Sequence, residues 1–190
     1  MGTRIVALLA VVGGVGLAIG TVRLIAAFIV DPDLHAWDLA AEQFGGPAMS
    51  FLGEASLAAI GLSLGGVAVV LVDRIHWAIA IAAVLGTTGV FVALLGAYSA
   101  WILLPVGTVA VGLYLANLGV VHWWVALLHA AAGAGFLVLI AEFLTNATIG
   151  PVGLAILVYA ITWSAIGIEL LRTVARDGST GQTSSGIGVP

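Results

Sequence analysis

Apolar stretches, each long enough to cross a membrane, recur along almost the whole chain. A helix needs about 20 residues to cross a hydrocarbon core of about 30 Å. Six such stretches lie at about 4–30, 47–72, 75–95, 98–118, 121–143 and 149–171. Of the 190 residues, 62% are apolar and 7% are charged, against roughly a quarter charged in an ordinary soluble domain. The sequence therefore predicts an all-α fold, a polytopic transmembrane helical bundle with short loops.

The number of spans depends on how one long uncharged run is divided. Residues 75–118 contain no charged side chain. We place a tight turn at 95–99, where Gly96 and Ser99 permit the turn and Tyr98 suits the membrane interface. This division gives six spans. If the run were one span with a re-entrant piece, the alternative of five spans would follow.

The arginines predict the orientation of the chain. In a six-span bundle one side receives Arg4, Arg74, Arg172 and Arg176. Arginine-rich ends lie in the cytoplasm by the positive-inside rule, so we expect a multi-pass protein of the cell membrane with both termini cytoplasmic. Residues 1–172 form the transmembrane domain, and 173–190, with little to bury, are predicted to be a disordered cytoplasmic tail. Asn146 begins a glycosylation sequon on the opposite side, and its use is left open.

Missing residue types exclude several kinds of chemistry. The chain has no Cys, which excludes disulfides, thiolate catalysis and Cys-ligated metal centres. Lys is also absent, which excludes a lysine Schiff base. The net charge of −4, without any basic run, makes nucleic acid an unsuitable partner. No hydrolase or phosphate-binding motif occurs, and we do not expect an enzyme.

Charged residues within apolar stretches are costly and mark functional candidates. Arg23 and Glu54 each lie seven residues from the neighbouring ends of the first two stretches, about 10 Å below the surface. They are predicted to lie at the same depth, where they could pair. Three roles are open: a static bridge between the two stretches, an arginine that snorkels outward, and a gate or proton-linked carboxylate. Glu169 and Arg172 are spaced for a second pair, on the surface of one helix.

His129 is the third candidate, because it lies within an apolar run of the fifth stretch. Such a histidine donates to a carbonyl, ligates haem or relays protons. His122 lies on the same face of the same helix, whereas bis-histidine haem needs two facing helices, so no cofactor is expected. Trp163 fits an aromatic belt at the interface, although Trp163 and Tyr159 lie deep enough to leave a substrate site open.

The first outer loop has a regular polar pattern. Residues 31–46 begin with Asp-Pro and end with Gly-Gly, which predicts a short amphipathic helix on the outer surface. Its polar face carries Asp31, His35, Asp38 and Glu42. These side chains suit either a divalent cation or simple solvation.

Glycines spaced by four predict close helix packing. Gly16 and Gly20 form one such pair, and Gly61 and Gly65 form another. Smooth glycine faces let helices approach in lipid. Besides the lipid bilayer, the expected partners are other membrane proteins or further copies of the chain.

Two function classes remain. The first is a non-catalytic subunit, assembly factor or scaffold of a membrane complex. The second is a small permease or channel for a proton, an ion or a small neutral solute, with Arg23, Glu54 and His129 along its path. A transport path is usually lined by several polar groups. The third and fourth stretches offer few polar groups, which favours the first class. The polar side chains in these two stretches are Thr87, Thr88, Ser99, Thr108 and Asn117.

Overall fold

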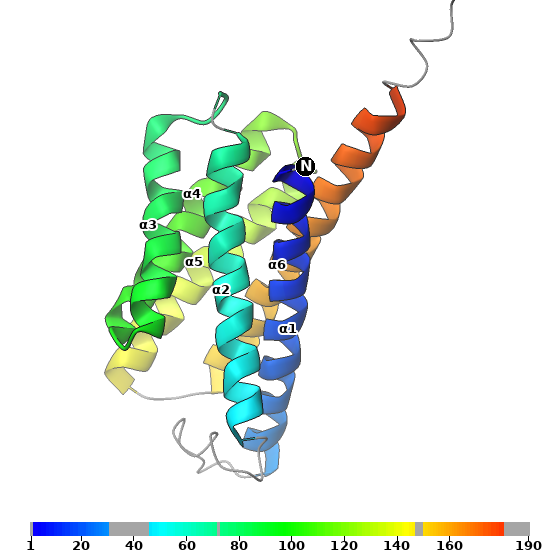
Figure 1. Cartoon of the computed structure of the whole chain (residues 1–190). Coiled ribbons are helices and arrows are strands. Elements are labelled where there is room, and N and C mark those ends of the chain that lie inside the picture. Colours follow the sequence, from blue (N-terminus) through cyan, green and yellow to red (C-terminus); the bar gives the residue numbers. More distant parts are fainter. Residues whose placement is uncertain (1, 31–45, 72, 147–149, 181–190) are drawn as a thin grey trace, which may run out of the picture.

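The computed structural model describes residues 2–30, 46–71, 73–146 and 150–180, and every regular element among them is a helix (Figure 1). The prediction of an all-helical fold is confirmed. The elements are α1 (Gly2–Val30), α2 (Gly46–Val70), α3 (Trp77–Leu94), the 3-10 helix η3 (Tyr98–Ile102), α4 (Leu103–Leu118), α5 (Trp123–Asn146) and α6 (Gly150–Thr180).

Successive α-helices run in alternating directions through one bundle (Figure 1). The N-terminus, the α2–α3 turn and the last turns of α6 lie at one end, which we call the N-terminal end. Two contacts support this arrangement. A methyl group at Gly2 would lie 3.6 Å from Val70 at the end of α2. The Thr173 hydroxyl in α6 donates to the carbonyl of Val120, between α4 and α5. Arg4, Arg74 and Arg172 therefore belong to the same end.

Five helical segments within the described part of the chain are long and apolar enough to cross a membrane. They are Gly2–Ala27, Phe51–Val70, Trp77–Leu94, Ala100–Leu118 and Gly153–Arg176. In α5 the apolar segment with described side chains, Trp123–Val138, is shorter. This composition is typical of a multi-pass membrane protein.

The helices are apolar on their outer faces as well as in the core. Ile60, Leu104 and Trp163 are fully buried, whereas Val12 and Val69 are 64% and 74% exposed. A surface helix of a water-soluble protein carries polar residues on its outer side. Helices that are hydrophobic all round suit a bundle bathed in lipid.

Within the long uncharged run the helix breaks close to the predicted turn. α3 ends at Leu94, and Gly96 turns the chain with a φ of 106°. η3 then leads directly into α4. Pro105 lies in the first turn of α4, where its missing N–H breaks no intrahelical hydrogen bond.

Glycine lets α1 touch α6 backbone to backbone. A methyl group at Gly14 would lie 2.6 Å from the carbonyl oxygen of Ala160. From the other side, a methyl group at Gly167 would lie 2.6 Å from the carbonyl oxygen of Ala7. Contacts this short leave no room for a side chain, so these two helices pack against each other through glycine.

Of the four glycines in the two predicted pairs, three lie against a neighbouring helix and one does not. Gly16 lies against Ser56, Gly61 against Val90 and Gly65 against Thr87, as close packing requires. A methyl group at Gly20 would meet no atom within 4 Å. Gly20 is therefore not part of a tight helix contact.

α6 is longer than the sequence predicted. The tail was expected to be disordered from residue 173, but α6 continues to Thr180. The Thr173 hydroxyl donates to the carbonyls of Val120 and Glu169, at 2.9 and 3.1 Å. These bonds tie the helix to the α4–α5 connection at a position where the sequence offers little apolar surface. Residues 181–190 lie outside the described part.

Candidate functional site

The three predicted site residues do not come together. Arg23 and Glu54 are exposed on the outer surface of α1 and α2, whereas His129 is fully buried in α5. Of the alternatives for Arg23 and Glu54, the structure does not form the pair, because no ion pair joins these two described side chains. The acidic face with Asp31, His35, Asp38 and Glu42 lies outside the described residues, as does the side chain of Asn146.

The register of α1 against α2 separates Arg23 from Glu54 in depth. Gly16 lies against Ser56. Because the helices are antiparallel, Glu54 is level with Ala18, and Arg23 lies five residues further along α1. At 1.5 Å per residue the offset is about 7 Å.

The two side chains also leave their helices in different directions. Glu54 lies seven residues before Gly61, and so on the same side of α2, and Gly61 contacts Val90 of α3. Arg23 follows Ile19 by four residues on the outward face of α1, where Ile19 is 54% exposed. The sequence alone placed both residues by counting from the loop, but packing of the helices sets their depth and direction.

His129 lies in a buried polar cluster formed by α4, α5 and α6. We define this His129 cluster as Thr108, His129, Tyr159, Thr162 and Trp163, all of them almost fully buried. Tyr159, Thr162 and Trp163 share one face of α6, being spaced by three and four residues. The His129 ring contacts Trp163 edge to face, with centroids 4.6 Å apart. The cluster thus joins three helices in the interior of the bundle.

The hydrogen bonds determine the tautomer of His129. The Thr162 hydroxyl donates to the carbonyl of Tyr159 at 2.8 Å, which uses its single proton. Its oxygen lies 3.1 Å from Nδ1 of His129, so that nitrogen must be the donor. A charged ring would be costly in this fully buried position, where Nε2 has no acceptor to donate to. His129 is therefore the neutral tautomer with the proton on Nδ1. Its Nε2 carries a lone pair and has no hydrogen-bond partner among the described residues.

A second short chain of hydrogen bonds runs from Tyr159. The Thr108 hydroxyl donates to the carbonyl of Leu104 at 2.9 Å, so the Tyr159 hydroxyl, 2.7 Å away, donates to Thr108. Both chains in the cluster end on backbone carbonyls, which cannot pass a proton on. The hydroxyls of the cluster consequently do not form a proton wire.

Two nitrogens of the cluster remain without partners. Nε2 of His129 is an acceptor and Nε1–H of Trp163 is a donor, and both are buried. Such groups ordinarily have a partner, often an ordered water. A bis-histidine haem would need a second histidine, and the cluster contains one. Nor do the described residues contain any group of three or more His, Asp and Glu side chains suited to a metal ion.

The sequence singled out His129, Tyr159 and Trp163 but missed Thr108 and Thr162. Trp163 was assigned to an interfacial belt, whereas Trp163 and Tyr159 are fully buried. The spacing of Tyr159, Thr162 and Trp163 predicts that they share one face of a helix. The sequence does not predict which helices pack against this face, because tertiary packing sets the arrangement of helices in the bundle.

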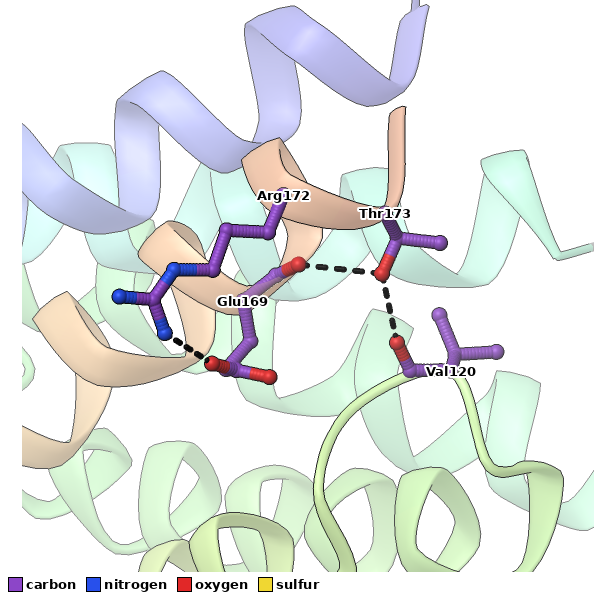
Figure 2. Close-up of polar contacts among 4 residues, drawn as sticks. All are labelled: Val120, Glu169, Arg172 and Thr173. Carbon is purple, nitrogen blue, oxygen red and sulfur yellow. Dashed lines mark hydrogen bonds and ion pairs between the residues drawn. The ribbon is translucent and has the colours of Figure 1, made fainter. Parts of the chain in front are cut away.

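A different polar contact ties the N-terminal end together (Figure 2). Arg172 donates to Glu169 at 2.7 Å, which confirms the predicted pair. The same helix turn carries Thr173, whose hydroxyl donates to Val120. The Arg172 side chain is 64% exposed, and exposed pairs contribute little to stability. This contact fixes a helix end and offers no enclosed site.

Comparison with protein-family models, with curated proteins and with solved structures finds no match to this chain.

Proposed function

We propose that this chain is a non-catalytic component of a membrane complex, a subunit or scaffold whose outer surface contacts another membrane protein. The observation that carries the proposal is the position of Glu54. Its side chain is exposed on the outside of an apolar helix, and no ion pair or hydrogen bond satisfies it among the described residues.

An exposed carboxyl group on an apolar helix, with no partner among the described residues, needs a partner from outside the chain. Acidic residues within a span almost always face a bundle interior, a cavity or a partner. Glu54 is eight residues from the start of α2 and lies within the apolar segment Phe51–Val70. A methyl group at neighbouring Gly53 would meet no atom within 4 Å, so the surface there is open. A transmembrane segment with a basic or hydrogen-bonding side chain fits this position.

The interior of the bundle does not favour transport. Each buried hydroxyl of Thr21, Ser56, Ser63, Thr108 and Thr162 donates to a backbone carbonyl. A hydroxyl bonded in this way satisfies the helix rather than a passing solute. Two apolar grooves with described linings open on the outside, beside α1. These features support a structural role.

The membrane topology belongs to the same proposal. Six spans, counting α5, place both termini on one side of the membrane. The N-terminal end holds Arg4, Arg74 and Arg172, and by the positive-inside rule this end faces the cytoplasm of a cell membrane.

A small permease is the second candidate, and the His129 cluster is the observation that favours it. Its unpartnered donor and acceptor, on Trp163 and His129, are the groups that a small solute or water would bind. The absence of a connected proton wire through the cluster hydroxyls counts against protons as the substrate.

The test compares Glu54→Leu with the original chain after mild solubilisation and affinity purification. We expect a stoichiometric protein partner with the original chain and its loss with Glu54→Leu, because leucine offers no hydrogen bond. Glu169→Gln, at the N-terminal end, is the matched control and should keep the partner. Native mass spectrometry identifies the species.

Two outcomes would contradict the proposal. One is a homogeneous monomer of the original chain, and the other is a partner that Glu54→Leu retains in full. Purified protein in liposomes with an internal pH dye tests the second candidate. Proton flux that disappears in His129→Phe would replace the structural role with transport.

A further inference from the structure

Two apolar grooves run along the outer face of α1, one on each side. The groove toward α6 has a volume of about 420 Å³ and is bounded by Ile161 and Ser164. The groove toward α2 has a volume of about 410 Å³ and is bounded by Leu52 and Ala55. Both are also lined by Val15 and Ile19. These two side chains therefore form a ridge between a pair of grooves of matching size.

The polar atoms in the groove walls are already satisfied. The Ser56 hydroxyl donates to the carbonyl of Leu52 at 2.6 Å, and the Ser164 hydroxyl donates to that of Ala160 at 3.2 Å. The walls thus offer no free donor to a polar ligand. A hydrocarbon chain is the kind of occupant that such a surface suits.

A single cation lies at the end of the ridge. Arg23 follows Ile19 by four residues, so it continues the same stripe of α1. Its side chain is exposed and forms no ion pair with the described residues. An arginine at this depth extends its guanidinium toward the lipid phosphates, for which its planar donors are well matched.

Two open glycine positions lie near Arg23. A methyl group at Gly20 or at Gly53 would meet no atom within 4 Å, in contrast to Gly13 and Gly16 nearer the start of α1. The surface at Gly20 and Gly53 is therefore uncovered within the described part of the chain. This is where the glycerol backbone of a lipid would lie.

We propose that the outer face of α1 is a binding site for one anionic phospholipid. Its phosphate binds Arg23, and its two acyl chains lie in the grooves on either side of Val15 and Ile19. A neighbouring helix, about 10 Å wide, would cover the ridge rather than fill two separate grooves. A zwitterionic lipid carries its own cation, which competes with Arg23 for the phosphate. This site borders the proposed partner surface at Glu54, because the open position at Gly53 belongs to both. Arg23→Gln tests the lipid site, and Glu54→Leu tests the partner surface.

The probe is phosphatidylglycerol in nanodiscs that also contain phosphatidylcholine, with retained lipids counted by native mass spectrometry. We expect one retained phosphatidylglycerol and an affinity at least about tenfold lower in Arg23→Gln, because a charge-assisted hydrogen bond is lost. Arg4→Gln, on the same helix at the N-terminal end, is the matched control and should bind normally. Arg23→Lys keeps the charge and should retain part of the preference.

A groove variant tests the acyl chains separately. Ala55→Phe fills the α2-side groove and should also release the lipid, whereas Ala131→Phe, at an exposed position on α5, should not. Equal retention by the original chain and Arg23→Gln would overturn the proposal, because the lipid would then be an unselective neighbour. Displacement by inorganic phosphate at millimolar concentration would also overturn it, since the acyl chains would contribute nothing.

Discussion

The two halves of α1 contain similar residues, but their glycines differ in how closely neighbouring helices approach. In the first half, Gly13 and Gly14 lie against the backbones of α2 and α6, with no room for a methyl group. In the second half, a methyl group at Gly20 would meet no atom within 4 Å, and Arg23 is exposed. Helix contact thus leaves no room for a side chain at Gly13 and Gly14, whereas the face of the second half that carries Gly20 and Arg23 is open. Elsewhere in the second half Thr21 and Ala27 are buried, and Ile25 lies against Gly153 of α6. A glycine in the sequence therefore does not by itself indicate whether its position is a close helix contact or an open surface.

We expect the largest loss of stability from a substitution in the first half of α1, where neighbouring helices leave no room for a side chain. Gly14→Ala places a methyl group 2.6 Å from the carbonyl oxygen of Ala160 and 2.7 Å from the amide nitrogen of Ser164. Backbone atoms cannot move aside as a side chain can, so we expect a loss of stability of about 1–3 kcal/mol or more. Unfolding in mixed micelles at increasing SDS fraction measures it.

Gly167→Ala approaches the same interface from α6 and provides the control. A methyl group there would lie 2.6 Å from the carbonyl oxygen of Ala7. We expect a similar loss, and a double variant whose loss is smaller than the two single losses added, because one helix displacement relieves both contacts. Unchanged stability in both single variants would mean that α1 and α6 are further apart than described.

We expect an intermediate loss of stability from a substitution in the His129 cluster, which is buried in the bundle. Tyr159→Phe removes the donor to Thr108, whose own proton remains bonded to Leu104. The expected loss of stability is about 0.6 kcal/mol, the average for hydrogen bonds between membrane helices. The same SDS titration reports it, with Tyr114→Phe in α4 as the matched control. A loss of several kcal/mol would show that the hydroxyl holds a larger network.

We expect the smallest change in stability from a substitution at Gly20, on the open face of the second half of α1. Gly20→Ala introduces no contact, and alanine favours the helix by up to about 1 kcal/mol over glycine. Stability should therefore stay the same or rise slightly, measured beside Gly14→Ala under identical conditions. Equal destabilisation by the two substitutions would remove the distinction between the halves of α1.

Helix positions were readable from the sequence because lipid imposes length and apolarity on every span. In the uncharged run from 75 to 118 the helix breaks close to the predicted turn, since Gly96 marks a turn that few other residues could make. The end of α6 was misplaced because the bond of Thr173 to Val120 comes from tertiary packing.

The candidate site was less predictable than the helices. His129 stood out because an ionisable residue is rare in an apolar run, and it is indeed buried. Its partner Thr162 was missed, because a threonine in a membrane helix usually bonds its own backbone. Arg23 and Glu54 were placed together by counting from the loop, while the contact of Gly16 with Ser56 sets a different register.

The central claim is that this bundle is closed to water inside and bathed in lipid outside. The chain has no native cysteine, so a single Thr108→Cys variant reports on the interior without background. Thr108 is fully buried, and we expect no reaction with a water-soluble thiol reagent in membranes, whereas Arg74→Cys in the α2–α3 turn should react fully. Rapid labelling at position 108 would reveal an aqueous path through the bundle and contradict the account.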